Sequence, residues 1–236
     1  MMLCIDSGNT RLKWGLADSR GWRAQGVLSQ TEIAILPEIA GNPVPQRILI
    51  ANVAGAEIAA RIESALAPLG VAAEFVRSTA QAGGVSNGYA NPSQLGVDRW
   101  CALIGAWNLV RQPCIVAGSG TALTIDTLDQ QGHFQGGVIL PGLDLMRQAL
   151  ARNTAQLPLA SGQWQAWPDN TDDAIASGCL EAQLGAIERA QARSSEATCL
   201  LFGGNAAQLA GRLNCPHRVV DNLVLEGLRV LASNDG

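Results

Sequence analysis

The sequence of 236 residues is poor in the side chains that most often carry catalysis. It contains two histidines, His133 and His217, and a single lysine, Lys13. A metal site built from three imidazoles is therefore excluded, and a Ser-His-Asp triad would have only two candidates for its base. Because Lys13 lies in no GxxxxGK[ST] segment, the Walker-type phosphate loop is absent as well. Carboxylates must carry whatever proton chemistry the protein performs.

Charge is also scarce, at 15% of residues against an average of about 25%, while hydrophobic residues make up 47%. A chain of this composition can bury a core and is not expected to be disordered. The 16 basic and 20 acidic residues give a net charge of -4, which provides no basic surface for nucleic acid or for an anionic membrane. We therefore expect a small-molecule partner, with no nucleic acid and no membrane.

The cysteines and the lack of long apolar runs bear on the cellular compartment. The six cysteines occur singly, without C-x-x-C spacing, which is typical of buried free thiols. Asp6 interrupts the apolar start, so no signal peptide is expected, and no run of 18 apolar residues could span a membrane. These features predict a cytoplasmic protein with reduced cysteines.

The predicted elements occur twice in the same order. In the first half, the pattern predicts a hairpin, two further strands, a helix, a strand, a glycine-rich loop and a linking helix, over residues 2–17, 22–28, 47–53, 56–66, 71–76, 79–93 and 94–110. After residue 113, strands are predicted over 114–128, 133–142 and 198–204, and helices over 143–150, 172–192, 206–213 and 223–231. The repeat predicts an α/β protein with mixed sheets in two domains, residues 1–112 and 113–236, with the ligand where they face each other.

Each half has a glycine turn after its first strand. The first, DSGNT, places a carboxylate at a strand end, then a glycine where the backbone can approach a phosphate, then two polar side chains. The second, GSGTA, lies in the equivalent place. Such turns are either ordinary hairpin turns or parts of a phosphate clamp for Mg²⁺-nucleotide, and their occurrence in both halves favours the clamp. Its candidate residues are Asp6, Gly8, Asn9, Thr10, Gly120, Thr121 and Ala122.

A carboxylate beside a guanidinium opens the linking helix, where Asp98 and Arg99 follow Gly96 and Val97. Asp98 could remain ionised and accept a proton from an alcohol, while Arg99 holds an anion. The alternative is an acidic residue that favours the helix dipole, followed by a solvated arginine.

Seven motifs, in order over nearly the whole chain, resemble those of type III pantothenate kinases: DSGNT, NPSQLGVDRW, GSGTALTID, GGVILPG, NTAQLP, NTDDAIASG and GGNA. That family belongs to the superfamily of acetate and sugar kinases, heat-shock chaperone ATPases and actin. The resemblance therefore implies two duplicated ribonuclease H-like domains and a homodimer. It further implies ATP-dependent phosphorylation of pantothenate to 4′-phosphopantothenate, the first step of coenzyme A synthesis. Relatives named Bvg accessory factors leave a second hypothesis, a nonenzymatic nucleotide-binding regulator.

The resemblance also implies roles for individual residues. Asp98 would be the general base, and Asp6 would lie at the Mg²⁺ that accompanies ATP. The two glycine turns would bind the phosphates. Pantothenate contacts are implied for Tyr89, Gly96, Val97 and Arg99, and for Thr171 from the partner subunit.

Two positions leave questions open. The family's second phosphate motif commonly begins with Asp, as D-x-GTA, and that carboxylate helps to hold a monovalent cation. This chain has Gly118 there, which argues against a potassium or ammonium site. Lys13, seven residues after Asp6, either approaches a nucleotide phosphate or lies at a strand edge with its amine in solvent.

Overall fold

The structure is a computed structural model that describes residues 1–41 and 43–233. Contacts divide the chain into two compact units. The first contains Met1–Arg111, Gly132–Phe134 and the C-terminal helix α7 (Leu223–Ser233), and the second contains Gln112–Gln131 and Gln135–Asp221. The division into domains of residues 1–112 and 113–236 remains a prediction.

The first unit is built on a five-stranded sheet in the order β3-β2-β1-β4-β5. Strand β1 pairs antiparallel with β2 and parallel with β4, so the sheet is mixed, as the sequence predicts. The predicted hairpin is confirmed, and it turns between β1 and β2. The strands are β1 (Met2–Ser7), β2 (Arg11–Asp18), β3 (Gly21–Ser29), β4 (Arg47–Asn52) and β5 (Ala73–Phe75).

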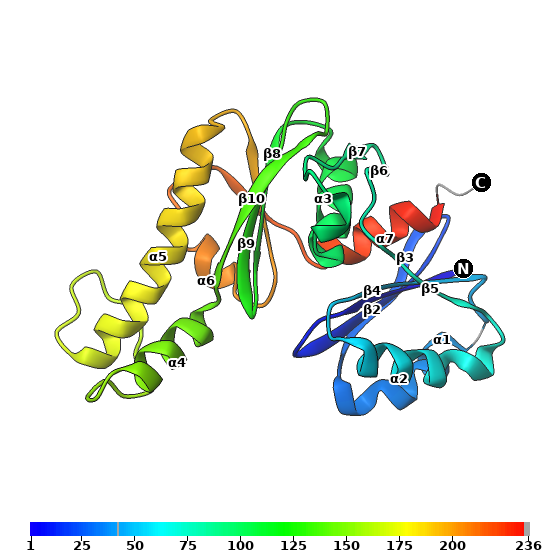
Figure 1. Cartoon of the computed structure of the whole chain (residues 1–236), viewed down its shortest axis with the longest axis horizontal. Coiled ribbons are helices and arrows are strands. Elements are labelled where there is room, and N and C mark those ends of the chain that lie inside the picture. The colour runs from blue at the N-terminus through cyan, green and yellow to red at the C-terminus, as the bar shows by residue number, and fades with distance from the viewer. Residues whose placement is uncertain (42, 234–236) are drawn as a thin grey trace. The chain divides into compact units, whose positions relative to one another are not determined.

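Successive side chains of β1 point to opposite faces of this sheet. Leu3 and Ile5 are fully buried in one core, together with apolar residues of α2 (Ala56–Leu66). Figure 1 shows α2 and the short α1 (Leu36–Ala40) on the same side of the sheet. Cys4 and Asp6 therefore face the other side, where α3 (Val97–Val110) and α7 pack. A residue at position 6 consequently faces the start of α3.

Helices α3 and α7 pack closely against each other. A Cβ atom at Gly227 would collide with the carbonyl group of Cys101, and one at Gly105 would collide with the carbonyl group of Leu223. Because both positions are glycine, the two helix backbones can touch. The contact fixes the helix that begins with the candidate catalytic residues.

The glycine-rich loop before α3 contains a small hairpin, β6 (Gln81–Ala82) and β7 (Val85–Ser86), and a 3-10 turn, η3 (Pro92–Gln94). The helix predicted from residue 94 begins instead at Val97. The reason is local, because the turn η3 ends at Gln94 and Gly96, the residue before the helix, has an extended backbone.

The second unit repeats the architecture of the first. Its sheet has the order β10-β9-β8-β11-β12, in which β8 pairs antiparallel with β9 and parallel with β11. This equivalence confirms the predicted duplication. The strands are β8 (Cys114–Ser119), β9 (Ala122–Leu128), β10 (Phe134–Pro141), β11 (Thr198–Phe202) and β12 (His217–Val219), and the helices are α4 (Leu143–Asn153), α5 (Thr171–Arg193) and α6 (Ala206–Ala210).

The long helix α5 contributes one side of the core of the second unit, with apolar residues of β8, β9 and β11 on the other side. The six cysteines are all free, and five of them are buried, as the sequence predicts. Across the described residues, no helix combines the length and apolar character needed to cross a membrane.

Candidate active site

Asp6 and Lys13 lie opposite each other on the paired strands β1 and β2. Desolvation by burial raises the pKa of Asp6 to about 6, while the charge of Lys13 lowers it and the charge of Asp98 raises it. Two carboxylates and one amine therefore lie close enough to influence one another in the first unit. A site that places two carboxylates together is suited to a cation or to proton transfer.

The first glycine turn closes on itself. The Gly8 amide donates a hydrogen bond to the Arg11 carbonyl oxygen at 3.1 Å, and the Gln30 side chain donates to the Asn9 carbonyl oxygen at 3.0 Å. Asn9 and Thr10 are exposed at the tip. Gly8 thus shapes the turn, and the polar groups that a ligand would meet are those of the two residues that follow it.

Asp98 lies in the first turn of α3, next to the extended Gly96. Its Oδ1 accepts a hydrogen bond from the Arg99 amide at 2.8 Å. A Cβ atom at Gly96 would lie 2.7 Å from the same oxygen. The glycine therefore leaves room for the carboxylate, and the amide orients it. Val97, the first helical residue, is partly buried.

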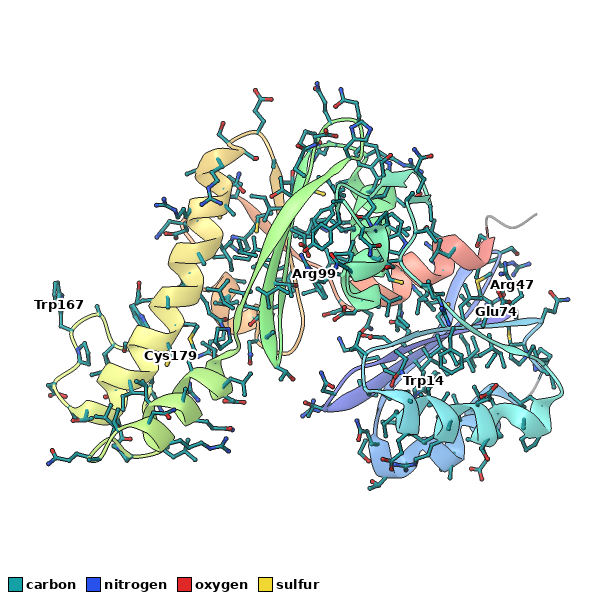
Figure 2. All side chains as sticks on the ribbon, in the orientation of Figure 1. Trp14, Arg47, Glu74, Arg99, Trp167 and Cys179 are labelled. Atoms are coloured by element: carbon teal, nitrogen blue, oxygen red, sulfur yellow. The ribbon has the colours of Figure 1, made fainter. Side chains whose placement is uncertain are left out.

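Arg99 is 5% exposed, so the alternative of a solvated arginine is wrong. Its guanidinium donates to the Tyr89 hydroxyl at 3.1 Å, and its Cζ lies 5.8 Å from the centre of the Tyr89 ring. Arg99 lies on α3 and is labelled in Figure 2. The Arg99 guanidinium is therefore buried beside an aromatic ring, which attracts a cation.

Asn87 shapes the loop that carries Tyr89, and sequence reasoning missed it. The Asn87 amide nitrogen Nδ2 donates to the carbonyl oxygens of Thr79 and Pro92, both at 3.2 Å, and its Oδ1 accepts from the Tyr89 amide at 3.0 Å. These bonds tie both ends of the loop together. The signal was available, because asparagine in a glycine-rich loop is a common organiser of turns.

The second glycine turn lies in the second unit, between β8 and β9. The Gly120 amide donates to the Ala122 carbonyl oxygen at 2.9 Å, and the Gly142 amide donates to the Thr121 carbonyl oxygen at 2.9 Å. Gly120 is exposed, and a Cβ atom there would meet nothing within 4 Å. The turn is thus closed internally and leaves open space beside Gly120. The same kind of internal closure occurs at Gly8.

A buried polar network supports the second turn. Gln183 of α5 is fully buried, and its side chain accepts a hydrogen bond from the Ser119 hydroxyl at 3.1 Å and donates to the Pro141 carbonyl oxygen at 3.1 Å. Sequence reasoning missed Gln183. A polar residue on the buried face of α5, four residues after Cys179 and before Ile187, was the available signal.

Gly118 is covered by an aromatic ring. It pairs with Phe202 on the neighbouring strand β11, and a Cβ atom at Gly118 would collide with the Phe202 ring. The room that an aspartate side chain would need is therefore filled. This packing agrees with the departure noted in the sequence.

Thr171 is the exposed first residue of α5, after the cap residue Asn170. It lines a groove of about 680 Å³ between α4 and α5, with Met146, Leu150 and Ile175 among the other lining residues. Most of the lining is apolar. Thr171 and the second turn lie in one unit, while Asp6 and the residues at the start of α3 lie in the other.

The carboxylates suit magnesium. Over residues 1–41 and 43–233, no group of three or more His, Cys, Asp or Glu side chains could hold a metal ion by itself. Mg²⁺ in phosphate-transfer sites is commonly bound by one or two carboxylates together with substrate phosphates and water. Asp6, partly buried and close to the charge of Asp98, fits that pattern.

Comparisons with known proteins point to one family. A model of the type III pantothenate kinase family matches residues 2–193. The type III pantothenate kinase of Aromatoleum aromaticum is 52% identical over 239 residues, covering 100% of this chain and 99% of that protein. That of Dechloromonas aromatica is 49% identical, covering 98% and 99%.

Solved structures share the fold at low identity. A Campylobacter jejuni protein assigned to the Baf family of transcriptional activators has a TM-score of 0.64 at 18% identity, over 98% of both chains. The inorganic polyphosphate/ATP-glucomannokinase of Arthrobacter sp. strain KM has a TM-score of 0.51 at 13% identity, over 99% of both chains. The shared fold is that of actin-like ATPases, and it has two mixed sheets of equivalent strand order. By sequence, the chain belongs to the type III pantothenate kinase family.

Proposed function

We propose that this protein transfers the γ-phosphoryl group of ATP to the primary hydroxyl of pantothenate and releases 4′-phosphopantothenate. The reaction is the first step of coenzyme A synthesis. The observation that carries the proposal is the position of Asp98 close to Asp6 within a chain that matches this family over its length. One carboxylate can accept a proton, and the other would hold the Mg²⁺ that accompanies ATP.

Asp98 acts as the general base. The Arg99 amide orients its carboxylate, and Gly96 leaves room for that carboxylate at the start of the helix. Proton transfer to Asp98 makes the oxygen a better nucleophile as its bond to phosphorus forms. A nonenzymatic regulator would have no need of an alcohol-activating carboxylate in this position.

Arg99 binds the only ionised group of pantothenate, its carboxylate. The guanidinium is buried and donates to Tyr89, so its orientation is largely set before the substrate arrives. Gly96 and Val97 line the same start of α3. Pre-organisation of this kind lowers the cost of binding.

The phosphates are held by positioning and charge. Asp6 would hold Mg²⁺, and the bound ion would neutralise the charge that develops on the phosphoryl group. Lys13, opposite Asp6 on β2, adds positive charge on the same face. The polar groups of the first turn and the open second turn bind phosphate oxygens. The residues of the two turns are Gly8, Asn9, Thr10, Gly120, Thr121 and Ala122.

A second copy of the chain completes the site in our proposal. The groove between α4 and α5 is apolar, and the second unit also exposes Ile139 at 64%, Leu159 at 65% and Trp167 at 93%. Figure 2 shows Trp167 projecting from the loop before α5. Exposed apolar surface of this kind is typical of a homodimer interface. It would deliver the exposed Thr171 to the partner's pantothenate site.

Mixing two inactive variants tests the dimer. Thr171→Arg puts a bulky charge into the partner's pocket, and Asp98→Asn removes the base from its own site, so each homodimer should be nearly inactive. Co-expression should restore activity, because a mixed dimer has one site with both defects and one with neither. If mixed preparations that demonstrably exchange subunits gain no activity, the assignment of Thr171 is wrong.

A coupled assay with purified protein, ATP, Mg²⁺ and pantothenate tests the reaction itself. Formation of ADP that depends on pantothenate supports the proposal, and nucleotide binding without turnover would favour the regulatory alternative. The cytoplasmic location stays a prediction that rests on six free cysteines.

A further inference from the structure

Phe134 packs against Tyr89 and Arg99, the two side chains proposed to bind pantothenate, although it lies 35 residues after Arg99 in the chain. Its side chain is 1% exposed. The centres of the Phe134 and Tyr89 rings are 5.3 Å apart, with an angle of 40° between the ring planes. The Arg99 Cζ lies 5.9 Å from the centre of the Phe134 ring and 5.8 Å from that of Tyr89. Two aromatic rings therefore adjoin one guanidinium.

The backbone before Phe134 is anchored to the same loop. We call residues Gly132–Phe134 the strap. The Ser86 amide donates to the Gly132 carbonyl oxygen at 3.1 Å, and Ser86 forms a parallel bridge with His133. Gly132 has a φ of +79°, and a Cβ atom there would lie 2.8 Å from both the Gly84 carbonyl oxygen and the Trp107 ring. The strap thus cannot shift without moving the loop that carries Tyr89.

We propose that Phe134 is a positioning residue that fixes the Arg99 guanidinium for the carboxylate of the substrate. The inference rests on the proposed role of Arg99 in binding pantothenate. An aromatic face attracts a guanidinium, most strongly where water is excluded, and it restricts the planes in which the guanidinium can lie. Phe134 would act through Arg99 and Tyr89, and it would not touch the reacting atoms.

This role predicts a selective kinetic effect. Phe134→Leu keeps an apolar side chain but removes the aromatic face, so we expect the KM for pantothenate to rise by about tenfold. The kcat and the KM for ATP should stay within about twofold, because the Asp98 carboxylate is oriented by a backbone amide. Phe134→Tyr keeps the ring and should stay near the parent. Phe75→Leu, at a partly buried phenylalanine that packs against the core of the same unit, is the control.

A double-mutant cycle with Arg99→Met tests whether Phe134 acts on the KM for pantothenate through Arg99. In the Arg99→Met background, Phe134→Leu should add less than twofold to the KM for pantothenate. If Phe134→Leu gives a poorly folded protein by thermal unfolding, Phe134→Met serves as the second variant without a ring, and the same tenfold rise is expected.

Three outcomes would overturn the inference. The first is a KM for pantothenate that Phe134→Leu raises no more than Phe75→Leu does. The second is a rise that persists in the Arg99→Met background, and the third is an equal loss in kcat and in ATP affinity. If Arg99→Met alone raises the KM while Phe134→Leu does not, only the inference about Phe134 fails. If Arg99→Met changes nothing, the proposed role of Arg99 fails with it.

Discussion

The two glycine turns occupy equivalent places in two sheets of the same strand order, yet their surroundings differ. In the first unit, Asp6 pairs with the small Ala51 on the parallel neighbour strand β4. In the second unit, Gly118 pairs with the large Phe202 on the parallel neighbour strand β11. Each pair combines one larger residue, Asp6 or Phe202, with one small residue, Ala51 or Gly118. The duplicated fold therefore supports a carboxylate in one turn and an aromatic cover in the other.

The difference in charge follows the same division. Asp6 lies opposite Lys13 and is close to the charge of Asp98, whereas the position opposite Gly118 on β9 is Thr124. Proton transfer and metal binding would then rest on the first unit. The second unit would bind phosphate through a neutral turn. Two sheets of the same strand order thus carry turns of different chemistry.

The largest effect is expected from removing charge at the start of α3. Asp98→Asn keeps the shape of the side chain but removes the proton acceptor, so kcat should fall by a factor of about 10² to 10⁴, with little change in the affinity for ATP. Steady-state kinetics measures both. Asp144→Asn is the matched control, because Asp144 is also the second residue of a helix, α4. An equal effect of both variants would reduce Asp98 to a residue that favours the helix dipole.

A substitution at Gly118 tests the difference in packing between the two glycine turns. Gly118→Asp forces a carboxylate against the Phe202 ring, and it should destabilise the protein by about 2–4 kcal/mol in urea unfolding. In a Phe202→Ala background, the additional cost of Gly118→Asp should be smaller by about 1–3 kcal/mol, since the ring is gone. Gly204→Asp is the control, because a Cβ atom there meets nothing within 4 Å. Equal costs in both backgrounds would show that Phe202 does not exclude the carboxylate.

The raised pKa of Asp6 predicts that the difference in stability between the parent and the Asp6→Asn variant depends on pH. In the folded protein the Asp6 carboxyl stays protonated up to about pH 6, whereas in the unfolded chain it loses its proton near pH 3.8. The ionisation of Asp6 therefore lowers the free energy of unfolding as the pH rises between these values. Asp6→Asn should therefore be more stable than the parent by about 1–3 kcal/mol at pH 7 and equally stable at pH 3. Thermal unfolding without Mg²⁺ or ATP measures the difference. A constant difference across this range would contradict the raised pKa.

In the same variant, the loss of a metal-binding carboxylate should weaken activity with Mg²⁺-ATP at every pH. In the parent, a bound Mg²⁺ would favour the ionised carboxylate and lower the pKa of Asp6 below its value of about 6 in the metal-free protein. Raising the Mg²⁺ concentration should therefore move the acid side of the parent's activity profile to lower pH. An acid side that does not respond to Mg²⁺ would place the metal elsewhere.

The smallest effect is expected from monovalent cations. Without a carboxylate at position 118, a potassium or ammonium ion would have to bind to carbonyl and hydroxyl groups alone. Activity in potassium, ammonium and tetramethylammonium buffers of equal ionic strength should therefore agree within about twofold. Strong activation by potassium would show that another group, with Asp126 as the first candidate, supplies the charge.

Much of the fold could be predicted because it follows local rules. Apolar runs and helical spacing located most elements to within a few residues, and the repeat of their order gave two equivalent sheets. The start of α3 differed, since the turn at Pro92–Gln94 and the extended Gly96 interrupt the helical pattern. Hydrophobic periodicity does not register such backbone geometry.

The site could be predicted only in part. Asp6, Asp98 and Arg99 stand in distinctive motifs, so their chemistry is visible in the sequence. The burial of Arg99 was not visible, because a charged residue in the first turn of a helix is more often exposed. Asn87 acts through hydrogen bonds to backbone groups of its own loop, and Gln183 acts through bonds to Ser119 and Pro141, which are far from it in the chain. Both residues leave only weak local signals in the sequence.

By itself, the sequence determined the class of fold, its duplication, the family and the residue types available for catalysis, because these depend on local patterns and on motif order. Only the tertiary structure decided which residues meet. The pairing of β1 with β2 brought Lys13 opposite Asp6, and the pairing of β8 with β11 put Phe202 over Gly118. The strap brought Phe134 to Arg99. Contacts between residues far apart in the chain depend on strand register and side-chain packing, which no local pattern specifies.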